Sequence, residues 1–416
     1  MHALRCFTAA FLCCVGVSLP LEAADWPQFL GPHRNGISAE TGLLKSWPAA
    51  GPKEVWRVKA GVGMSGVSIA GNRVLTLYQT GGNQKVLCLD AASGKTLWDT
   101  PISPEYENGQ GDGPRATPTV DGDAVYVYGG EGMLAALTLA DGKIRWQHDV
   151  PKELGVKPAE YGMASSPLVA GELVLVQVGG PGATVVAYDK QGKLSWKSGS
   201  DSAGYSSPIL AKLGGREQVV VFSGKAALGL VPTDGRMLWR YPYATEYDCN
   251  TASPVALGAD QVLISAGEQH GSTLLALKSE GDAFKVSETW KSLGAESSLR
   301  SEWQTTVALD GHLYGLDNVG SAGPVTHLTC IETATGKRVW QEQRFGKANL
   351  IAADGKLFLS TMKGELVVVK ASPKAYEELG RKVVIGKTRN APSLAAGRVY
   401  LRDDKEIVAL DVSEGK

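Results

Sequence analysis

Features that would point to several common functions are missing from this 416-residue chain. Its 42 basic and 43 acidic residues nearly cancel, and no run of five or more basic residues occurs. The charge therefore gives no electrostatic footprint for nucleic acid. After the N-terminal segment, no stretch reaches the eighteen apolar residues that suggest a membrane-spanning helix, and long helical patterns are nearly absent.

Cysteine and histidine are scarce, with six residues of each type. Three cysteines lie within the first 14 residues, which leaves Cys88, Cys249 and Cys330 as an odd number. Cys88 and Cys330 occupy the same place in two copies of a repeat, where other copies have alanine or glycine. We interpret them as buried packing residues rather than a disulfide or a metal pair. The histidines show no metal-ligand spacing, and the chain has no P-loop, Gly-x-Ser-x-Gly elbow or His-Glu-x-x-His motif.

The first 24 residues form a predicted export signal. Arg5 provides a positive charge, Phe7 to Leu19 form an apolar run, and the small residues Ala23 and Ala24 close the segment. We predict cleavage after Ala23 or Ala24, with an uncleaved membrane anchor as the alternative. The mature protein is then expected to be exported, either periplasmic or secreted.

One phrase recurs along the rest of the chain at intervals of roughly 40–50 residues. It reads LCLDAASGKTLWD at 87–99 and AALTLADGKIRWQ at 135–147. Similar copies occupy 186–198, 228–240 and 329–341, with a weaker copy between the last two. Repetition at such a period is typical of solenoids and propellers.

Each copy closes a unit of four short strands. In SSPLVAGELVLVQVGGPGATVVAYDKQGKLSW, residues 165–196, alternating runs are separated by turns. Four antiparallel strands in such a unit are typical of a β-propeller blade. Eight units can be aligned, so we predict an all-β, eight-bladed β-propeller. The units begin at Ser65, Arg115, Ser165, Ser206, Thr251, Gln304, Asn349 and Asn390.

The last unit is incomplete, because VALDVSEGK at 408–416 stops where a Lys-x-x-Trp strand should follow. The missing piece occurs near the other end of the mature chain, as KEVW at 53–56. We predict that this N-terminal strand completes the eighth blade and closes the ring, which removes the open sheet edges. The expected divisions are a signal peptide at 1–24, a leader segment at 25–52 and the propeller at 53–416.

A tryptophan recurs at the end of the phrase. A buried tryptophan covers about 150–250 Å², so we interpret these residues as wedges that hold neighbouring blades together. The seventh unit, residues 367–384, lacks both the Gly-Lys turn and the tryptophan, and we predict that it forms the weakest seam. The recurrent residues are Trp56, Trp98, Trp146, Trp196, Trp239, Trp290 and Trp340.

The phrase Ala-x-Asp-x-x-x-Gly-Lys-x-x-Trp resembles the tryptophan-docking repeat of quinoprotein dehydrogenases and of outer-membrane protein assembly factor B, both eight-bladed propellers. DWPQFLGPHRNGIS at 25–38, GPRATPTVDGDAVYVYG at 113–129 and DGHLYGLDN at 310–318 are similar to the exported group with PQQ-binding-like β-propeller repeats. The resemblance covers essentially the whole mature chain. It is specific for the fold and says little about activity, because one fold hosts many functions.

The resemblance implies two different functions. A quinoprotein alcohol dehydrogenase is expected to hold calcium or a lanthanide beside its quinone with Glu, Asn and Asp, to use an Asp base, to stack the quinone on a Trp and often to carry vicinal cysteines. The only adjacent cysteines, Cys13 and Cys14, lie in the predicted signal, and neither a Cys-x-x-Cys-His haem site nor a hard-cation loop occurs. We therefore expect no catalytic residues, no metal and no cofactor, and pyrroloquinoline quinone (PQQ) with Ca²⁺ only under the enzyme alternative.

Polar and aromatic residues gather where each unit enters its innermost strand. These entries should lie on one rim of the central channel, and long loops on a rigid scaffold are where binding residues concentrate. The rim is either a solvated surface with structural hydrogen bonds or a site for a ligand or partner. The candidate residues are Arg115, Tyr161, Tyr205, Tyr247, Asp248, Asn250, Arg300, Glu302, Trp303, Asn349, Arg389 and Asn390.

Three of these candidates, Arg115, Arg300 and Arg389, are expected to converge on the channel mouth, with Glu302 and Asp248 near enough to pair with some of them. The balance of these observations favours an exported, non-catalytic binding or assembly scaffold that acts through its rim and channel. A PQQ-dependent dehydrogenase of alcohols or sugars is the alternative. The expected partner is a protein or a small polar or glycan ligand. We expect a monomer with no nucleic acid and no membrane span.

Overall fold

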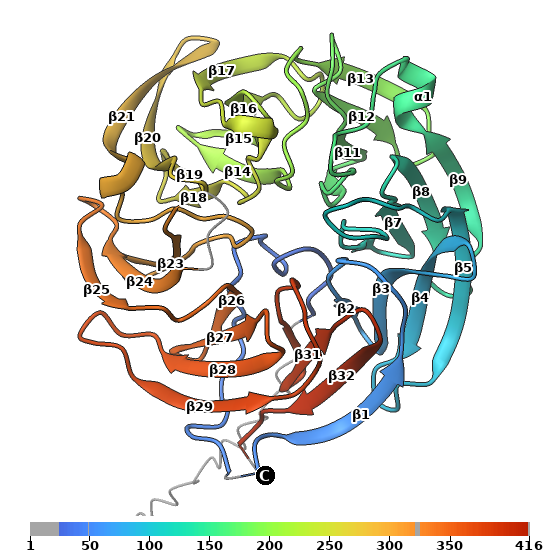
Figure 1. The fold of residues 1–416 in the computed structure, drawn as a ribbon. Helices are drawn as coiled ribbons and strands as arrows, with labels where there is room; N and C mark the ends of the chain where they lie inside the picture. Colours follow the sequence, from blue (N-terminus) through green and yellow to red (C-terminus); the bar gives the residue numbers. More distant parts are fainter. Residues whose placement is uncertain (1–24, 49, 321–324, 415–416) are drawn as a thin grey trace, which may run out of the picture.

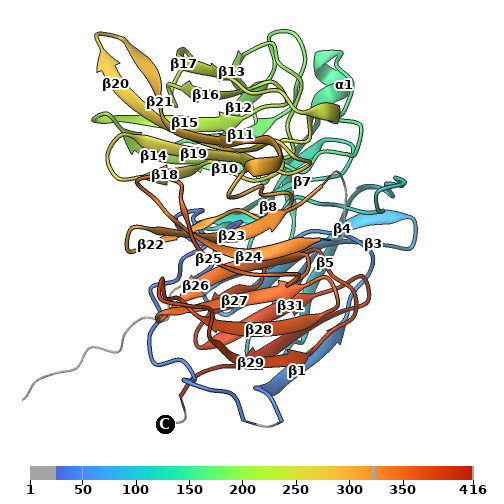
Figure 2. The same ribbon diagram turned by 60° about the vertical axis from the view of Figure 1, so that its left-hand side comes forward.

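The computed structural model of the protein describes residues 25–48, 50–320 and 325–414. The predicted export signal at 1–24 lies outside the described residues. Eight four-stranded antiparallel sheets form a closed ring around a central channel (Figure 1), and they stack side by side around it (Figure 2). The prediction of an eight-bladed β-propeller is confirmed.

The first four blades follow one another along the chain. Their strands, from the innermost to the outermost, are β2 (Ser68–Ala70), β3 (Arg73–Thr80), β4 (Asn83–Asp90) and β5 (Thr96–Pro104); β6 (Thr119–Asp121), β7 (Ala124–Tyr128), β8 (Met133–Thr138) and β9 (Ile144–Asp149); β10 (Leu168–Ala170), β11 (Leu173–Gln177), β12 (Val185–Asp189) and β13 (Leu194–Ser198); β14 (Ile209–Leu213), β15 (Arg216–Phe222), β16 (Ala226–Leu230) and β17 (Met237–Pro242).

The remaining blades continue in the same order, except that the last takes its outermost strand from the start of the chain. They are β18 (Val255–Leu257), β19 (Gln261–Ala266), β20 (Gly271–Glu280) and β21 (Ala283–Leu293); β22 (Val307–Leu309), β23 (His312–Asn318), β24 (Thr326–Glu332) and β25 (Arg338–Glu342); β26 (Ala348–Ala353), β27 (Lys356–Thr361), β28 (Glu365–Lys370) and β29 (Glu378–Val383); β30 (Ser393–Ala395), β31 (Arg398–Arg402), β32 (Glu406–Asp411) and β1 (Lys53–Lys59). The helical pieces of the described chain are α1 (Val150–Leu154), η1 (Glu246–Asp248) and η2 (Gly294–Glu296).

The ring closes as predicted. Strand β1 pairs antiparallel with β32, with Lys53 opposite Asp411 and Trp56 opposite Ala409. Because the first and last strands of the propeller share one blade, the hydrogen bonds of a single sheet join the two ends of the propeller. The part of the chain that the structure describes contains no helix long and apolar enough to cross a membrane.

Six of the seven recurrent tryptophans join one blade to the next. The indole N–H of Trp98 donates a 3.0 Å hydrogen bond to the carbonyl of Leu139, in the turn between the third and fourth strands of the following blade. Trp56 donates to Ala91 in the same way at 2.9 Å. The indole ring of each of these two tryptophans also packs against the glycine of that turn. Trp146, Trp196, Trp290 and Trp340 make equivalent bonds to Lys190, Pro232, Thr333 and Ser372.

The fourth and seventh blades depart from this pattern. Trp239 donates instead to Gln218 of its own blade, at 2.6 Å, because the next blade has no Gly-Lys turn to receive it. In the seventh blade Gly380 stands opposite Val368, the register position that holds tryptophan elsewhere. The ring of Trp47, from the leader, packs on Gly380 so closely that an added Cβ would lie 2.7 Å from it. The leader thus supplies the indole that this blade lacks.

The leader also closes one end of the channel. Trp26 exchanges two backbone hydrogen bonds with Ile69 of β2 in the first blade, and Gly36 and Ser38 bond Ala352 of β26 in the seventh blade. Between them the buried guanidinium of Arg34 donates to the carbonyls of Ser166, Pro167 and Pro208, in the third and fourth blades. Figure 1 shows this segment in blue across the middle of the ring. The channel is therefore blind rather than open at both ends.

The cysteine interpretation is confirmed for the repeat positions. Cys88 lies opposite Trp98 and Cys330 opposite Trp340, and both thiols are fully buried and free. Each is a small apolar residue packed opposite a tryptophan in the middle of its blade.

Candidate functional site

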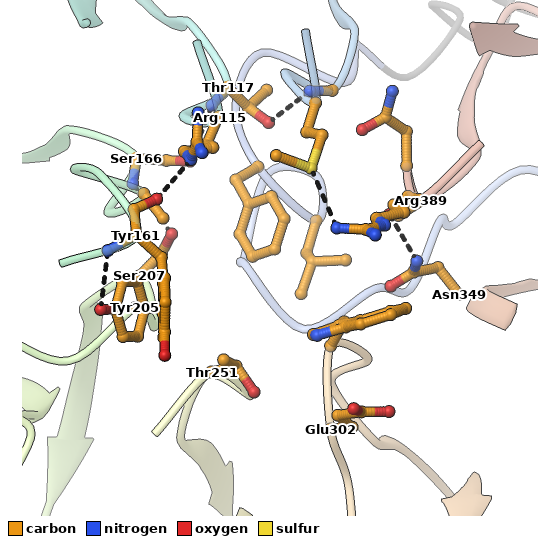
Figure 3. Close-up of a pocket in the computed structure, with 18 of the residues that line it drawn as sticks. Arg115, Thr117, Tyr161, Ser166, Tyr205, Ser207, Thr251, Glu302, Asn349 and Arg389 are labelled. Atoms are coloured by element: carbon orange, nitrogen blue, oxygen red, sulfur yellow. Dashed lines mark hydrogen bonds between the residues drawn. The ribbon is translucent and has the colours of Figure 1, made fainter. Parts of the chain in front are cut away.

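The main candidate site is a pocket of about 580 Å³ in the channel, open at the rim and floored by the leader. Trp26, Phe29 and Leu30 form the floor, while the walls come from the segments that enter the innermost strands (Figure 3). A volume of this size suits a small molecule. The leader and the blades therefore form this pocket together.

Nine of the twelve residues predicted for the rim line this pocket. Most come directly before an innermost strand, where the chain crosses from the outer edge of one blade to the channel. The nine are Arg115, Tyr161, Tyr205, Tyr247, Glu302, Trp303, Asn349, Arg389 and Asn390.

The other three predicted residues do not line it. Arg300 is 3% exposed and donates to both carboxylate oxygens of the buried Asp317, at 2.7 and 2.9 Å, so it turns into the blade to neutralise that charge. Asn250 is fully buried and donates to the carbonyls of Ser223 and Tyr243. Asp248 lines a smaller neighbouring cavity.

The expected ion pairs of the rim also differ from those found. Asp248 pairs with Lys225 at 2.5 Å and Glu302 with Lys347 at 2.6 Å, so neither carboxylate meets an arginine. The expected convergence of three arginines is therefore wrong for Arg300 and holds for the other two, which both line the pocket. Lys225 lies in the turn between β15 and β16 and Lys347 directly before β26, and these positions place their ammonium groups beside the two carboxylates.

Arg389 and Arg115 form the basic side of the pocket. Arg389 donates to the carbonyl of Gln110 at 2.7 Å, and its guanidinium lies 4.8 Å from the centre of the Trp303 ring. Arg115 donates to the carbonyls of Tyr161, Gly111 and Gly113. Within the described ranges, neither arginine has a carboxylate within ion-pair distance. Burial lowers the pKa of Arg115, and the nearby positive charge of Arg389 acts in the same direction.

Glu302, Lys347 and Glu268 line the part of the wall next to Arg389. The Lys347 ammonium pairs with Glu302 and lies 4.2 Å from the centre of the Trp303 ring, so this ring meets two cations. Glu268 lines the pocket without an ion-pair partner among the residues that the structure describes. Burial raises the pKa of Glu268, and the charge of Glu302 raises it further.

Tyrosines and a thiol complete the walls. The rings of Tyr161 and Tyr205 stack with centroids 5.8 Å apart, and the Tyr205 hydroxyl accepts a 3.2 Å hydrogen bond from the Tyr161 backbone N–H. Burial raises the pKa of Tyr205. Burial, with help from Glu268 and other carboxylates, raises the pKa of Cys249 to about 12, so its thiol stays protonated at neutral pH and is a poor nucleophile.

Sequence reasoning missed several lining residues. Lys347 lies two residues before the predicted Asn349, so its place at a strand entry was a usable signal. Glu268 lies in a turn between β19 and β20, away from any strand entry. The leader residues of the floor carry no periodic pattern, and only the folded ring shows that they enter the channel.

These residues do not fit a metal-dependent quinone centre. In the described part of the chain, no group of three His, Cys, Asp or Glu side chains could hold a metal ion. The lysine paired with Glu302 already satisfies the carboxylate that a hard cation would need. Trp303 offers a ring for stacking, but two cations already lie against it. The pocket therefore supplies charge and aromatic surface.

The ring, the docking tryptophans and the channel pocket define a class of eight-bladed propellers with PQQ-like repeats. Within it, a sequence model of the family described as "Outer membrane protein assembly factor BamB" matches residues 40–156, 82–342 and 325–416. The chain belongs to this family.

Individual relatives are more distant. The BamB of Alkalilimnicola ehrlichii is 30% identical over 99 residues, which is 23% of this chain, and the match spans only about a quarter (24%) of that protein's length. The quinohemoprotein alcohol dehydrogenase of Comamonas testosteroni has a TM-score of 0.67 at 13% identity, covering 94% of this chain and 81% of that one. BamB from Moraxella catarrhalis has a TM-score of 0.61 at 13% identity, covering 86% and 99%. At such identities the structural likeness shows the fold alone.

Proposed function

We propose that this protein is an exported, non-catalytic propeller that binds a ligand or a protein partner through its rim and blind channel, as a scaffold for assembly. The observation that carries the proposal is the composition of the pocket. It presents two arginines, a lysine–glutamate pair and stacked tyrosines, and its thiol is held protonated. Such a set binds polar groups but has no activated nucleophile.

Family membership supports the assembly role and the exported location. The matched family is described as an outer membrane assembly factor, which is a function carried out beyond the inner membrane. The predicted signal at 1–24 agrees with export to the periplasm or beyond. We propose that the protein acts as a monomer, because the closed ring leaves no blade incomplete.

A PQQ-dependent dehydrogenase is the second candidate. The ring of Trp303 in the channel pocket is the observation that favours it, since the quinone of such enzymes is expected to stack on a tryptophan. The pairing of Glu302 with Lys347 weighs against it, because an ammonium group occupies the position beside the carboxylate where a cation would bind.

Capture of partners from the exported fraction tests the scaffold role. Tagged protein would be compared with Arg389→Glu, which reverses a charge in the pocket, and with Arg216→Glu as a matched control. Arg216 also lies on an aromatic ring and bonds backbone carbonyls, but at the periphery. We expect Arg389→Glu to lose its bound species while the control keeps them. Identical capture by all three proteins would contradict a role for the pocket. Arg115 is left unchanged because it holds the loop that contains Gly111 and Gly113.

A further inference from the structure

The charges of the pocket do not balance. Its lining contains three cationic side chains, Arg115, Lys347 and Arg389, and two carboxylates, Glu268 and Glu302. Lys347 and Glu302 neutralise each other at 2.6 Å. Two arginines then face one carboxylate, and burial disfavours the ionised form of that carboxylate. The side chains that line the free pocket therefore carry more positive than negative charge in a partly desolvated space, and the carboxylates of Asp112 and Glu131 act on Arg115 from outside the lining. An anion bound beside the two arginines would offset the charge that remains.

Arg389 is the side chain best placed to meet such an anion. Figure 3 shows it extending from the wall toward the middle of the pocket. The Asn349 side chain fixes its backbone by donating a 2.8 Å hydrogen bond to the Arg389 carbonyl, and the Trp303 ring supports the guanidinium. The hydrogen bond to the Gln110 carbonyl uses only the Nη1 atom of the Arg389 guanidinium. The remaining N–H groups of a supported guanidinium are suited to a bidentate contact with a carboxylate or phosphate.

Left-handed backbone conformations also occur in the lining of this pocket. Three lining residues other than glycine have left-handed φ angles: Leu30 at 57°, Tyr247 at 56° and Glu268 at 51°. Several other such residues, Asp310, Asp354 and Ala396, are explained by hairpin turns, because each precedes a glycine between two paired strands. Glu268 also lies in a hairpin turn, between the paired strands β19 and β20, whereas no hairpin turn accounts for Leu30 or Tyr247. Strain of this kind is retained where the surrounding structure holds a site in a defined shape.

We propose that the pocket binds a small organic anion, with its carboxylate or phosphate group on Arg389 beside Arg115 and its body against the stacked rings of Tyr161 and Tyr205. This inference rests on the proposed binding function and names the ligand class of the same site. The blind floor favours a small molecule, since a ligand can enter from the rim only and the volume is about 580 Å³. The tyrosine rings favour a ligand with a ring, such as an acidic sugar, because aromatic faces pack on flat or cyclic groups.

Calorimetric titration with three matched sugars tests the proposal. D-glucuronate carries a carboxylate, D-glucose 6-phosphate carries a phosphate, and D-glucose carries neither. We expect saturable binding of at least one anion at millimolar or lower concentration, roughly tenfold or more tighter than glucose. The anion that binds more tightly shows whether the pocket prefers a carboxylate or a phosphate group. Glucose binding as tightly as both anions, or no binding of either anion, would overturn the proposal.

Variants locate the site. Arg389→Gln should weaken anion binding by roughly tenfold or more, Arg389→Lys should keep part of it, and Arg216→Gln should leave it unchanged. Arg389→Lys retains the charge and guards against misfolding of the glutamine variant, and melting curves check both. Undiminished binding by folded Arg389→Gln would also overturn the proposal. If partners are still captured while no anion binds, only the ligand class fails and the scaffold role stands.

Discussion

At Gly142 a single methyl group would collide with the seam between two blades. The residue has a φ of 71°, and an added Cβ would lie 2.5 Å from the Trp98 ring. The Gly-Lys turn of the repeated phrase is thus explained by two constraints that act together, a left-handed backbone and an indole packed against it. The sequence showed the recurrence of both residues, but not that they belong to adjacent blades.

The first prediction separates these constraints. Gly142→Ala should lower the free energy of unfolding by about 1–3 kcal/mol more than Gly122→Ala, because overpacking adds to the backbone penalty. Gly122 has a similar φ of 57° with open space around its Cα, so it is the matched control. Denaturant unfolding of both variants measures the difference. Equal losses would show that the indole contact contributes nothing at this turn.

The second prediction concerns Glu268 and pH. The charged groups that act on its carboxyl are Glu302, His270, Glu246 and Lys347, and burial with the charge of Glu302 raises its pKa. A carboxyl with a raised pKa takes up a proton as the pH falls through that value, which removes a negative charge from the site of the proposed anion. Affinity for D-glucuronate should therefore rise as the pH falls through the raised pKa of Glu268, as long as the sugar stays ionised. Glu268→Gln should flatten this profile. A wild-type profile with the opposite slope would contradict the assignment.

At the scale of elements, the repeats predicted every blade, and the incomplete last unit predicted the pairing of β1 with β32. The leader was not predicted beyond its boundaries, because its contacts are long-range and its sequence has no period. The same reason explains Arg300, since its orientation depends on Asp317 of β23 and not on its place at a strand entry. The position of a residue within the repeat predicts where its backbone lies. The direction of its side chain depends on the buried groups that it contacts.

The third prediction concerns the seventh blade, which the sequence marked as the weakest seam. Trp47→Ala should lower stability by about 2–4 kcal/mol, since it removes the ring that covers Gly380. Trp47→Phe should cost much less, because the indole N–H is buried without a hydrogen-bond partner among the described residues and only the ring packs. Thermal unfolding distinguishes the two. An equal cost for both variants would show that more than ring packing acts there.

At the scale of the whole molecule, the N-terminal region does two separate things: one part closes the ring of blades, and another part closes one end of the channel. Strand β1 completes the eighth blade, and the leader before it floors the pocket. The leader and strand β1 are separate stretches of the sequence, so the leader can be removed while β1 is kept. Closure of the ring could be predicted because the last repeat of the sequence lacks a strand. The position of the leader in the channel could not, because it leaves no such sign in the sequence.

The fourth prediction tests closure. Removing residues 25–60 should cause loss of solubility or a large drop in melting temperature, because β32 is left with an open edge. Removing residues 25–52, which keeps β1, should give a smaller drop and a soluble protein without the pocket floor. A protein lacking 25–60 that melts like the intact chain would refute the closed ring.

The central claim is that the channel pocket binds without catalysis. Its most direct test is incubation with PQQ and calcium, followed by dye-linked oxidation of alcohols and sugars. Glu302 is paired with Lys347, and the described residues offer no group of three His, Cys, Asp or Glu side chains to hold calcium beside a quinone, so we expect no rate above that of the quinone alone. A saturable, calcium-dependent rate that is lost in Trp303→Ala would contradict the claim and assign the pocket to a dehydrogenase.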